Sequence, residues 1–266
     1  MLVTEQAGYA VNDAWLVSEI NLTLVPGRLA VIIGPNGAGK STLLRLLTGE
    51  LKPSQGSVRV NGQKLGDYAP AELSKLRAVV PQHTILAFPF TVIEVVQLGV
   101  TVPGLMAHGA KSERLAEAML AKLGLAELAG RDYSSLSGGE RQRVHVARAL
   151  CQLEGAPQSD APRALLVDEP TSSLDIAHQL EVLRELRAQA RTGRIVVAVL
   201  HDLNLSAAYA DDVLLLANGR AQAFGAPRDI LSDALLSSAY RCNVKLNHVP
   251  DNSGPFLLPQ ACSVSE

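Results

Sequence analysis

Apolar and polar residues follow two different patterns along this chain, and the first is that of β-structure. Residues 1 to about 85 contain short apolar runs separated by turn signals, which predicts an antiparallel β region. These turn signals are Gly27, Gly56 and Asn61-Gly62. One strand-to-helix unit interrupts the region, because the apolar run from Leu29 to Ile33 precedes a helix-like segment from Thr42 to Thr48.

The second pattern is helical and extends from Thr91 to Leu153. Three apolar residues are predicted to share one helix face: Leu115, Met119 and Leu123. Gly124 then provides a plausible helix stop. Residues 86–153 are therefore predicted to form a helical lobe.

After a polar, proline-containing link from Glu154 to Pro162, strands and helices alternate. The apolar runs from Ala164 to Val167 and from Ile195 to Leu200 are typical of buried strands. A helical segment that stops at Gly193 lies between them. Its predicted apolar face contains Ile176, Leu180, Leu183 and Ala190. Such alternation predicts parallel strands joined by crossover helices.

This organisation predicts a single α/β domain over residues 1–266. Residues 1–85 and 154–225 form its core lobe, residues 86–153 the inserted helical lobe, and residues 226–266 a short C-terminal tail. The chain has 266 residues, of which 47% are hydrophobic, so it can bury a substantial core.

Charge and cysteine content exclude several classes of protein. A net charge of −2 gives no basic footprint for nucleic acid. The three cysteines form no C-x-x-C pair, which argues against a disulfide framework or a zinc site and favours a reducing cytoplasm. Residues 1–13 lack the pattern of a secretory leader, and no run approaches the ~18 apolar residues of a spanning helix.

The strand-to-helix unit contains the pattern G-x-x-x-x-G-K-[ST], which predicts a nucleotide site. Its residues are Gly34, Pro35, Asn36, Gly37, Ala38, Gly39, Lys40, Ser41 and Thr42. Backbone N–H groups close around phosphate oxygens, Lys40 reaches the β and γ phosphates, and the Ser41 hydroxyl ligates Mg²⁺. The helix N-terminus adds a favourable dipole for the anion. A glycine-rich turn alone would leave Lys40 and Ser41 unexplained.

A second potential anion site lies in the helical lobe, where Ser137, Gly138 and Gly139 precede a helical segment. A hydroxyl and glycine N–H groups at a helix start can hold an anion. The same residues also fit an ordinary capping box, with Ser137 as the cap and Glu140 three residues later. The sequence alone leaves both interpretations open.

Two adjacent carboxylates, Asp168 and Glu169, follow the buried run that begins at Ala164. Asp168 can hold Mg²⁺ directly or through water, and Glu169 can polarise an attacking water, as phosphoryl transfer requires. Alternatively, the two acids mark the point where a strand meets solvent.

Together with these sites, the segment Leu136–Gln142 (LSGGERQ) resembles the signature of the ATP-binding cassette (ABC) ATPases. The resemblance implies a RecA-like phosphate-loop core with an antiparallel β subdomain and an inserted α-helical subdomain. It implies that Gln82 senses Mg²⁺ and the attacking water, that His201 contacts the γ phosphate, and that Asp175 couples the two sites of a dimer.

The resemblance also implies an aromatic ring that stacks on adenine. Tyr9 matches this role by its position before the phosphate loop, and Trp15 is the rival residue. Stacking on a base contributes roughly 1–3 kcal/mol in nucleic-acid complexes. Tyr9 also fits the alternative of a core tyrosine in the β region.

In the ABC family no single chain closes its own ATP site. Ser137 and Gly139 of one subunit are implied to meet the γ phosphate bound by Lys40 of a second subunit. The chain has one copy of each motif, so the resemblance implies a homodimer with two composite sites for ATP and Mg²⁺. Hydrolysis and product release would then separate the lobes, and a partner protein can use that motion.

The resemblance is strongest to importers of haem, iron chelates and cobalamin, and among them to haemin-import ATPases, over roughly residues 2–259. It is carried by Gln82 with Leu86-Ala87-Phe88-Pro89-Phe90-Thr91-Val92, an insertion at Gln152–Arg163, the stretch Asp168–Asp175 and the stretch His201–Leu205. One departure is Val100, where haemin-import members usually have Arg. No second cassette or basic surface supports the alternative of a soluble ABC ATPase acting on DNA or ribosomes.

This branch implies an ATPase on the cytoplasmic face of the bacterial inner membrane, bound to two copies of a permease and served indirectly by a periplasmic haem-binding protein. Phe88, Pro89 and Phe90 either line a groove for a permease helix or anchor the two lobes to each other. Ferric siderophore or cobalamin import remains the alternative, because the ATPase subunit of such an importer does not touch the cargo.

Overall fold

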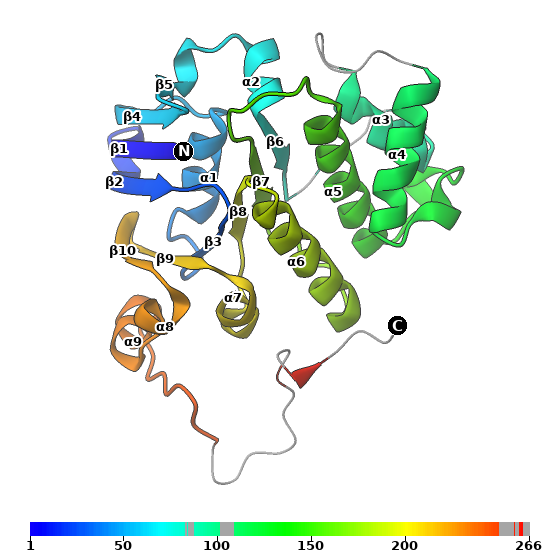
Figure 1. Ribbon diagram of the computed structural model, residues 1–266. Helices are drawn as coiled ribbons and strands as arrows, with labels where there is room; N and C mark the ends of the chain where they lie inside the picture. Colours follow the sequence, from blue (N-terminus) through cyan, green and yellow to red (C-terminus); the bar gives the residue numbers. More distant parts are fainter. Residues whose placement is uncertain (83, 85–87, 102–108, 250–257, 259–260, 263–266) are drawn as a thin grey trace.

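Two β-sheets and a group of helices make up the protein (Figure 1). The computed structural model describes residues 1–82, 84, 88–101, 109–249, 258 and 261–262. Within these residues, no helix is long and apolar enough to cross a membrane. The chain combines the predicted antiparallel β region with the predicted strand–helix alternation, so the expected α/β fold class is confirmed.

The larger sheet has six strands in the order β10-β9-β3-β8-β7-β6. The strands are β3 (Leu29–Ile33), β6 (Arg77–Val80), β7 (Ala164–Asp168), β8 (Ile195–Val199), β9 (Asp212–Ala217) and β10 (Arg220–Gly225). Five of them are parallel and only the edge strand β10 is antiparallel. Every residue of β3, β7 and β8 is buried, as expected for parallel strands covered on both faces.

The smaller sheet is antiparallel, in the order β2-β1-β4-β5. Its strands are β1 (Leu2–Val11), β2 (Ala14–Leu24), β4 (Gln55–Val60) and β5 (Gln63–Lys64). The turn Asn12–Asp13 between β1 and β2 and the turn Asn61–Gly62 between β4 and β5 have positive φ angles. Both are hairpin turns of the kind that Asn, Asp and Gly favour.

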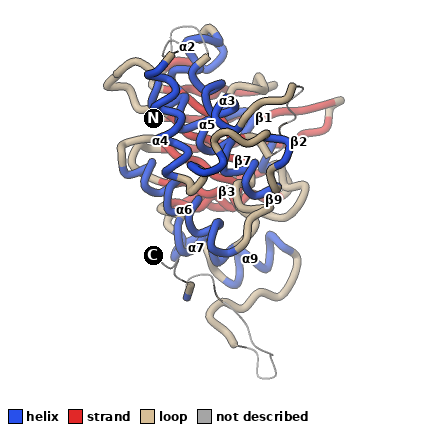
Figure 2. The backbone as a smooth tube through the Cα atoms, turned by 90° about the vertical axis from the view of Figure 1, so that its right-hand side faces the viewer, coloured by secondary structure: helices blue, strands red, loops and turns tan. Residues whose placement is uncertain are grey.

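Helices cover both faces of the larger sheet. They are α1 (Lys40–Thr48), α2 (Pro70–Leu76), α3 (Val92–Gln97), α4 (Ala110–Lys122), α5 (Gly138–Gly155), α6 (Ile176–Arg191), α7 (Leu203–Tyr209), α8 (Pro227–Ile230) and α9 (Asp233–Tyr240). Short 3₁₀ turns occur at Leu65–Asp67, Leu98–Val100, Ala126–Leu128 and Tyr133–Ser135. Helices α3, α4 and α5 gather on one side of the molecule (Figure 1), and from that side helices α4 and α6 lie in front of the strands (Figure 2).

Strand β3 separates two hydrophobic cores. Leu29, Val31 and Ile33 contribute to the core that contains α3 to α6, whereas Ala30 and Ile32 contribute to the core that contains α1 and the smaller sheet. This division follows from the period-two alternation of side chains along a strand. Strand β3 therefore fixes the position of the loop that follows it against both halves of the molecule.

Two details differ from the sequence expectations, and a third places a residue for which no burial was predicted. Helix α1 begins at Lys40 rather than Thr42. Ile176 is the first residue of α6 and is 40% exposed, although Leu180 and Leu183 on the same helix are buried. Val100 is 1% exposed, so the residue that departs from the haemin-import pattern is part of the core.

Candidate functional site

The phosphate-loop segment, residues Gly34–Thr42, connects β3 to α1 and takes a shape that requires glycine. Gly34 has φ +150°, and a Cβ there would lie 2.0 Å from the carbonyl oxygen of Leu216. Gly39 has φ +98°, and a Cβ there would lie 2.6 Å from the carbonyl oxygen of Leu16. Any other residue at these two positions would collide with the backbone. The loop is thus packed tightly between strands β2 and β9.

Lys40, the first residue of α1, is only 6% exposed. Its Nζ donates hydrogen bonds to the carbonyl oxygens of Gly34 and Pro35, each at 2.9 Å. Burial lowers the pKa of Lys40, while the carboxylates of Glu169 and Asp168 oppose this effect. The ammonium group is therefore held over the loop, at a helix N-terminus where backbone N–H groups favour an anion.

Ser41 and Asp168 face each other, with Ser41 Oγ 3.5 Å from Asp168 Oδ1. Asp168 ends strand β7 and is 8% exposed. Burial raises the pKa of Asp168, and the hydrogen bond from Ser41 opposes that shift. Among the described residues there is no cluster of three or more His, Cys, Asp or Glu side chains that could hold a metal by itself. A hydroxyl and a carboxylate nevertheless suit Mg²⁺, which takes few protein oxygens and completes its shell with phosphate and water.

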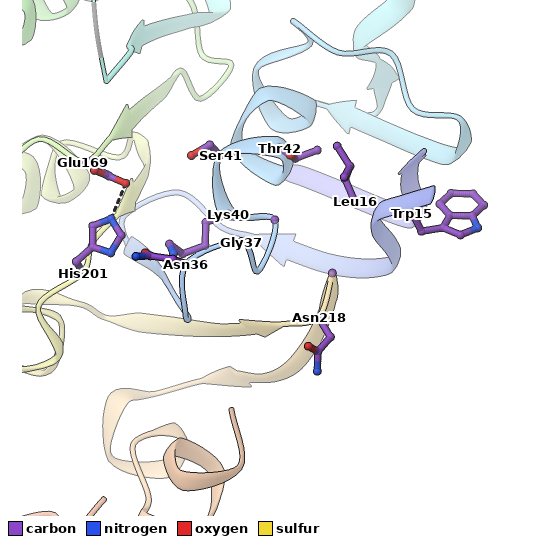
Figure 3. Close-up of a pocket in the computed structure, with 12 residues that line it drawn as sticks. Trp15, Leu16, Asn36, Gly37, Lys40, Ser41, Thr42, Glu169, His201 and Asn218 are labelled. Carbon is purple, nitrogen blue, oxygen red and sulfur yellow. Dashed lines mark hydrogen bonds and ion pairs between the residues drawn. The ribbon is translucent and has the colours of Figure 1, made fainter. Parts of the chain in front are cut away.

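Glu169 is held between two predicted site residues. Its Oε2 accepts a hydrogen bond from Gln82 Nε2 at 2.7 Å, and its Oε1 accepts one from His201 Nε2 at 2.5 Å (Figure 3). The backbone of Glu169 has φ +49°, a left-handed conformation that costs a non-glycine residue about 1–3 kcal/mol. Gln82, Glu169 and His201 follow the carboxyl ends of β6, β7 and β8, and the parallel sheet brings these ends to one edge.

A cavity of about 530 Å³ lies over the phosphate loop. It is lined by Trp15, Leu16, Asn36, Gly37, Gly39, Lys40, Ser41, Thr42, Glu169, His201, Asn218 and Gly219. Glu169 and His201 lie at one end of it, and Trp15 and Leu16 lie at the other (Figure 3). The cavity therefore places the charged groups around the loop and leaves an aromatic ring at the far end.

Leu16, Asn218 and Gly219 were not predicted as site residues. The Asn218-Gly219 pair forms the turn between β9 and β10, and both residues have positive φ angles. An Asn-Gly pair is a strong hairpin signal and could have been found in the sequence. Its contact with the phosphate loop could not, because the bond from Gly219 N–H to the carbonyl oxygen of Ala38 joins residues far apart in the chain.

The aromatic ring that lines the cavity is Trp15 and not Tyr9, while the ring that stacks on adenine stays a prediction. Tyr9 is half-buried and packs against the hydrophobic core of the smaller sheet. Trp15 is 50% exposed and lines the cavity. The two residues lie on neighbouring antiparallel strands, where Tyr9 pairs with Val17 and Ala10 with Trp15, so a shift of register along the hairpin decides which ring reaches the cavity.

The signature segment, residues Leu136–Gln142, lies outside this cavity. Ser137 caps α5, because its Oγ accepts a hydrogen bond from Glu140 N–H at 3.2 Å, and Glu140 Oε2 accepts one from Ser137 N–H at 2.7 Å. The capping-box interpretation therefore holds in the structure, and it leaves the anion-binding one untested. A Cβ at Gly139 would lie 2.9 Å from a side-chain atom of Leu174, so the start of α5 packs against the loop that leads to α6.

Asp175 caps α6 and contacts neither the cavity nor the carboxylates described above. It accepts a hydrogen bond from His178 N–H at 3.0 Å and lies 2.8 Å from His178 Nδ1. These bonds lower the pKa of Asp175. Gly138 lies beside Ser173, so the signature segment and the Asp175 loop meet on one surface of the molecule.

Phe88 and Phe90 form an edge-to-face pair with ring centroids 6.5 Å apart. Phe88 is 72% exposed, whereas Phe90 packs against the core that contains α3 to α6 and one face of the larger sheet. Phe90 thus fits the interpretation as an anchor, and Phe88 fits the interpretation as a docking residue. Leu86 and Ala87, which belong to the same motif, lie outside the described residues.

Comparisons with known proteins agree with this geometry. A family model described as ABC transporter matches residues 17–172. The chain is 47% identical over 264 residues to the hemin import ATP-binding protein HmuV of Chelativorans sp. (strain BNC1), covering 99% of this chain and 100% of the relative. It is 49% identical over 238 residues to the HmuV protein of Roseobacter denitrificans (strain ATCC 33942 / OCh 114), covering 90% and 89%.

Solved structures show the same fold. An inward-facing putative metal-chelate type ABC transporter has a chain that is 32% identical with a TM-score of 0.75, covering 90% of this chain and 88% of that one. The dimeric structure of a bacterial ABC transporter cassette is 26% identical with a TM-score of 0.73, covering 86% and 99%.

Proposed function

Since the chain belongs to the ABC transporter family, we propose that it is the ATP-binding and ATP-hydrolysing subunit of an importer that takes up haemin. The observation that carries the ATPase activity is the position of Glu169 between Gln82 and His201, beside the phosphate loop. The haemin cargo is supported by the names of the relatives that match nearly the whole chain.

The residues of the cavity have different roles in ATP hydrolysis. Lys40 and the backbone N–H groups of the loop bind the phosphates and offset their negative charge. Ser41 and Asp168 would hold Mg²⁺, which would neutralise charge on the phosphate oxygens. Glu169 orients a water molecule and accepts its proton, and His201 and Gln82 hold the Glu169 carboxylate in place.

A second copy of the chain completes each site in this proposal. The signature segment lies outside the cavity of its own chain, and the helix start at Ser137 carries backbone N–H groups that suit an anion. Ser137 and Gly139 of one subunit therefore contact the γ phosphate held by Lys40 of the other, and Asp175 lies at the junction. A matching cassette forms a dimer in its own structure, which supports this arrangement.

The partners of the dimer are two copies of a membrane-spanning permease in the bacterial inner membrane, with the ATPase on the cytoplasmic side. The exposed ring of Phe88 provides an apolar contact for a short permease helix, while Phe90 anchors it to the helical lobe. Haem reaches the permease from a periplasmic binding protein, which does not contact this chain.

Trp15→Ala is expected to weaken ATP binding by about fivefold or more, because loss of stacking on a base removes about 1–3 kcal/mol. Tyr9→Ala is the matched comparison, since Tyr9 lies on the neighbouring strand but faces the core. Equilibrium binding of ATP to both variants measures the difference, with thermal melting as a check on folding. Unchanged affinity in a folded Trp15→Ala protein, with a loss in Tyr9→Ala, would restore Tyr9 as the stacking ring.

Growth of a strain that lacks this chain tests the cargo. We expect loss of growth when haem is the only iron source, and normal growth on a ferric siderophore. A ferric siderophore importer is the second candidate, because one matching solved structure is described as a metal-chelate type transporter; loss of growth on siderophore alone would favour it. Growth of the same strain under conditions that require cobalamin uptake tests cobalamin as the cargo. Complementation with the wild-type gene is the control.

A further inference from the structure

The C-terminal helix α9 ends beside the phosphate loop. Ser232 caps this helix at its start, and Leu236 is fully buried in the same core as strand β9. At the other end of α9, Tyr240 is half-buried against that core. Burial raises the pKa of Tyr240, and a hydrogen bond from the backbone of Gly34 opposes the shift. The Tyr240 side chain therefore lies beside the first residue of the phosphate loop.

Gly34 is a sensitive point of that loop. Its carbonyl oxygen accepts one of the two hydrogen bonds that hold Lys40 Nζ. A Cβ at Gly34 would lie 2.0 Å from the carbonyl oxygen of Leu216 on β9. The contact with Tyr240 is made by the Gly34 backbone as donor, so it holds the peptide before the one whose carbonyl binds Lys40 and limits the movement of Gly34 between the two.

The next residue, Arg241, contacts a residue that lines the cavity. Its Nη2 donates a hydrogen bond to Asn218 Oδ1 at 3.3 Å, and Asn218 lines the cavity (Figure 3). Arg241 has φ +55° and ends α9 in the left-handed conformation. This backbone turn lets adjacent side chains diverge, so that one meets the phosphate loop and the other meets the β9–β10 turn.

The β9–β10 turn is itself attached to the phosphate loop. Gly219 N–H donates to the carbonyl oxygen of Ala38 at 3.1 Å, and the carbonyl oxygen of Gly219 accepts from Ser18 N–H at 2.8 Å. The end of α9 thus contacts the loop directly at Gly34 and, through Asn218 and Gly219, near Ala38.

We propose that Tyr240 and Arg241 are positioning residues of the nucleotide site, which set its affinity for ATP by holding the phosphate loop and the Asn218 turn in their binding geometry. The inference rests on the proposed ATPase function, and it assigns part of the site to the C-terminal tail. Arg241 also places a positive charge near the mouth of a cavity that is to hold a polyphosphate.

Tyr240→Phe tests the first contact, because it removes only the hydroxyl. Its control is Tyr209→Phe at the end of α7, where the ring packs against the same core. We expect the Kd for ADP and the KM for ATP to rise about threefold to tenfold in Tyr240→Phe, the range for one hydrogen bond, with kcat changed by less than about twofold. Equal Kd values for Tyr240→Phe and wild type would overturn the role of the hydroxyl.

Arg241→Ala tests the second contact without disturbing a buried residue. We expect a similar increase in Kd for ADP, and Arg241→Lys should recover part of the affinity because it retains a charged donor. Arg228→Ala is the control, since Arg228 lies on the neighbouring helix α8 with a side chain that is 88% exposed. A Kd for Arg241→Ala that equals those of Arg228→Ala and wild type would refute the role of Arg241, even if the Tyr240 variant failed to fold.

The wild-type titration distinguishes a failure of the proposed ATPase function from a failure of the proposed role of α9. If the wild-type protein does not bind ADP, the proposed ATPase function fails. If the wild type binds ADP and all variants bind it equally, only the role of α9 fails.

Discussion

Glu169→Gln is expected to lower ATP turnover by about 10²–10⁴-fold, the usual contribution of a general base, while ATP binding is preserved. The carboxylate accepts hydrogen bonds from Gln82 and His201, and an amide of the same shape can retain both contacts, with its N–H₂ group facing a histidine acceptor. The variant therefore loses the proton acceptor but keeps the geometry. Steady-state phosphate release measures the turnover, and a separate ATP titration measures binding.

The same variant also tests the dimer. If a second copy closes each site, Glu169→Gln with ATP and Mg²⁺ should elute as a dimer in size-exclusion chromatography, because unhydrolysed nucleotide remains between the subunits. Glu117→Gln, an exposed glutamate on α4, is the control and should behave as wild type. Turnover within about twofold of wild type in Glu169→Gln would remove Glu169 from the catalytic role.

Lys40→Ala is expected to weaken ATP binding by at least about tenfold, because hydrogen bonds to charged groups contribute about 1.5–3 kcal/mol. The Lys40 ammonium group is buried and lies within reach of the loop carbonyls of Gly34 and Pro35. Its removal takes a positive charge out of a site that is to hold several negative ones. Equilibrium binding of ATP, followed by fluorescence or calorimetry, gives the change in Kd.

Folding must be checked in this variant, since Lys40→Ala leaves the carbonyl oxygens of Gly34 and Pro35 without this donor. Thermal melting therefore accompanies the titration. Lys52→Ala is the matched control, because Lys52 is exposed just after the α1 segment. A folded Lys40→Ala protein that binds ATP with wild-type affinity would contradict the assignment of this lysine to the phosphates.

Much of the fold was predictable because its signals are local. Strands β3, β7 and β8 are fully buried, and continuous apolar runs marked them in the sequence. Helix α4 buries Met119 and is followed by Gly124 with φ +64°, as its spacing predicted. Errors occurred at element ends: Ile176 fits the helical period of α6 but lies at its exposed first turn, where period alone does not reveal what covers the helix.

Which of Tyr9 and Trp15 lines the cavity could not be predicted, for a related reason. Both are aromatic, and both precede the phosphate loop in the same hairpin. Which of them lines the cavity depends on the register of β1 with β2, and this pairing shifts beside Tyr9. A shift of the strand register by one residue turns a side chain to the other face of a sheet. Such a shift cannot be read from the sequence.

By itself, the sequence determined the chemistry of the site: a glycine loop with Lys40 and Ser41, and two carboxylates at the end of a buried strand. These features are local, because they depend on backbone freedom and on residue type over a few positions. Only the tertiary structure decided which groups meet. The parallel sheet brings Gln82 and His201 to Glu169, and the C-terminal helix reaches Gly34, since these contacts arise from strand order and packing between segments that are distant in the chain.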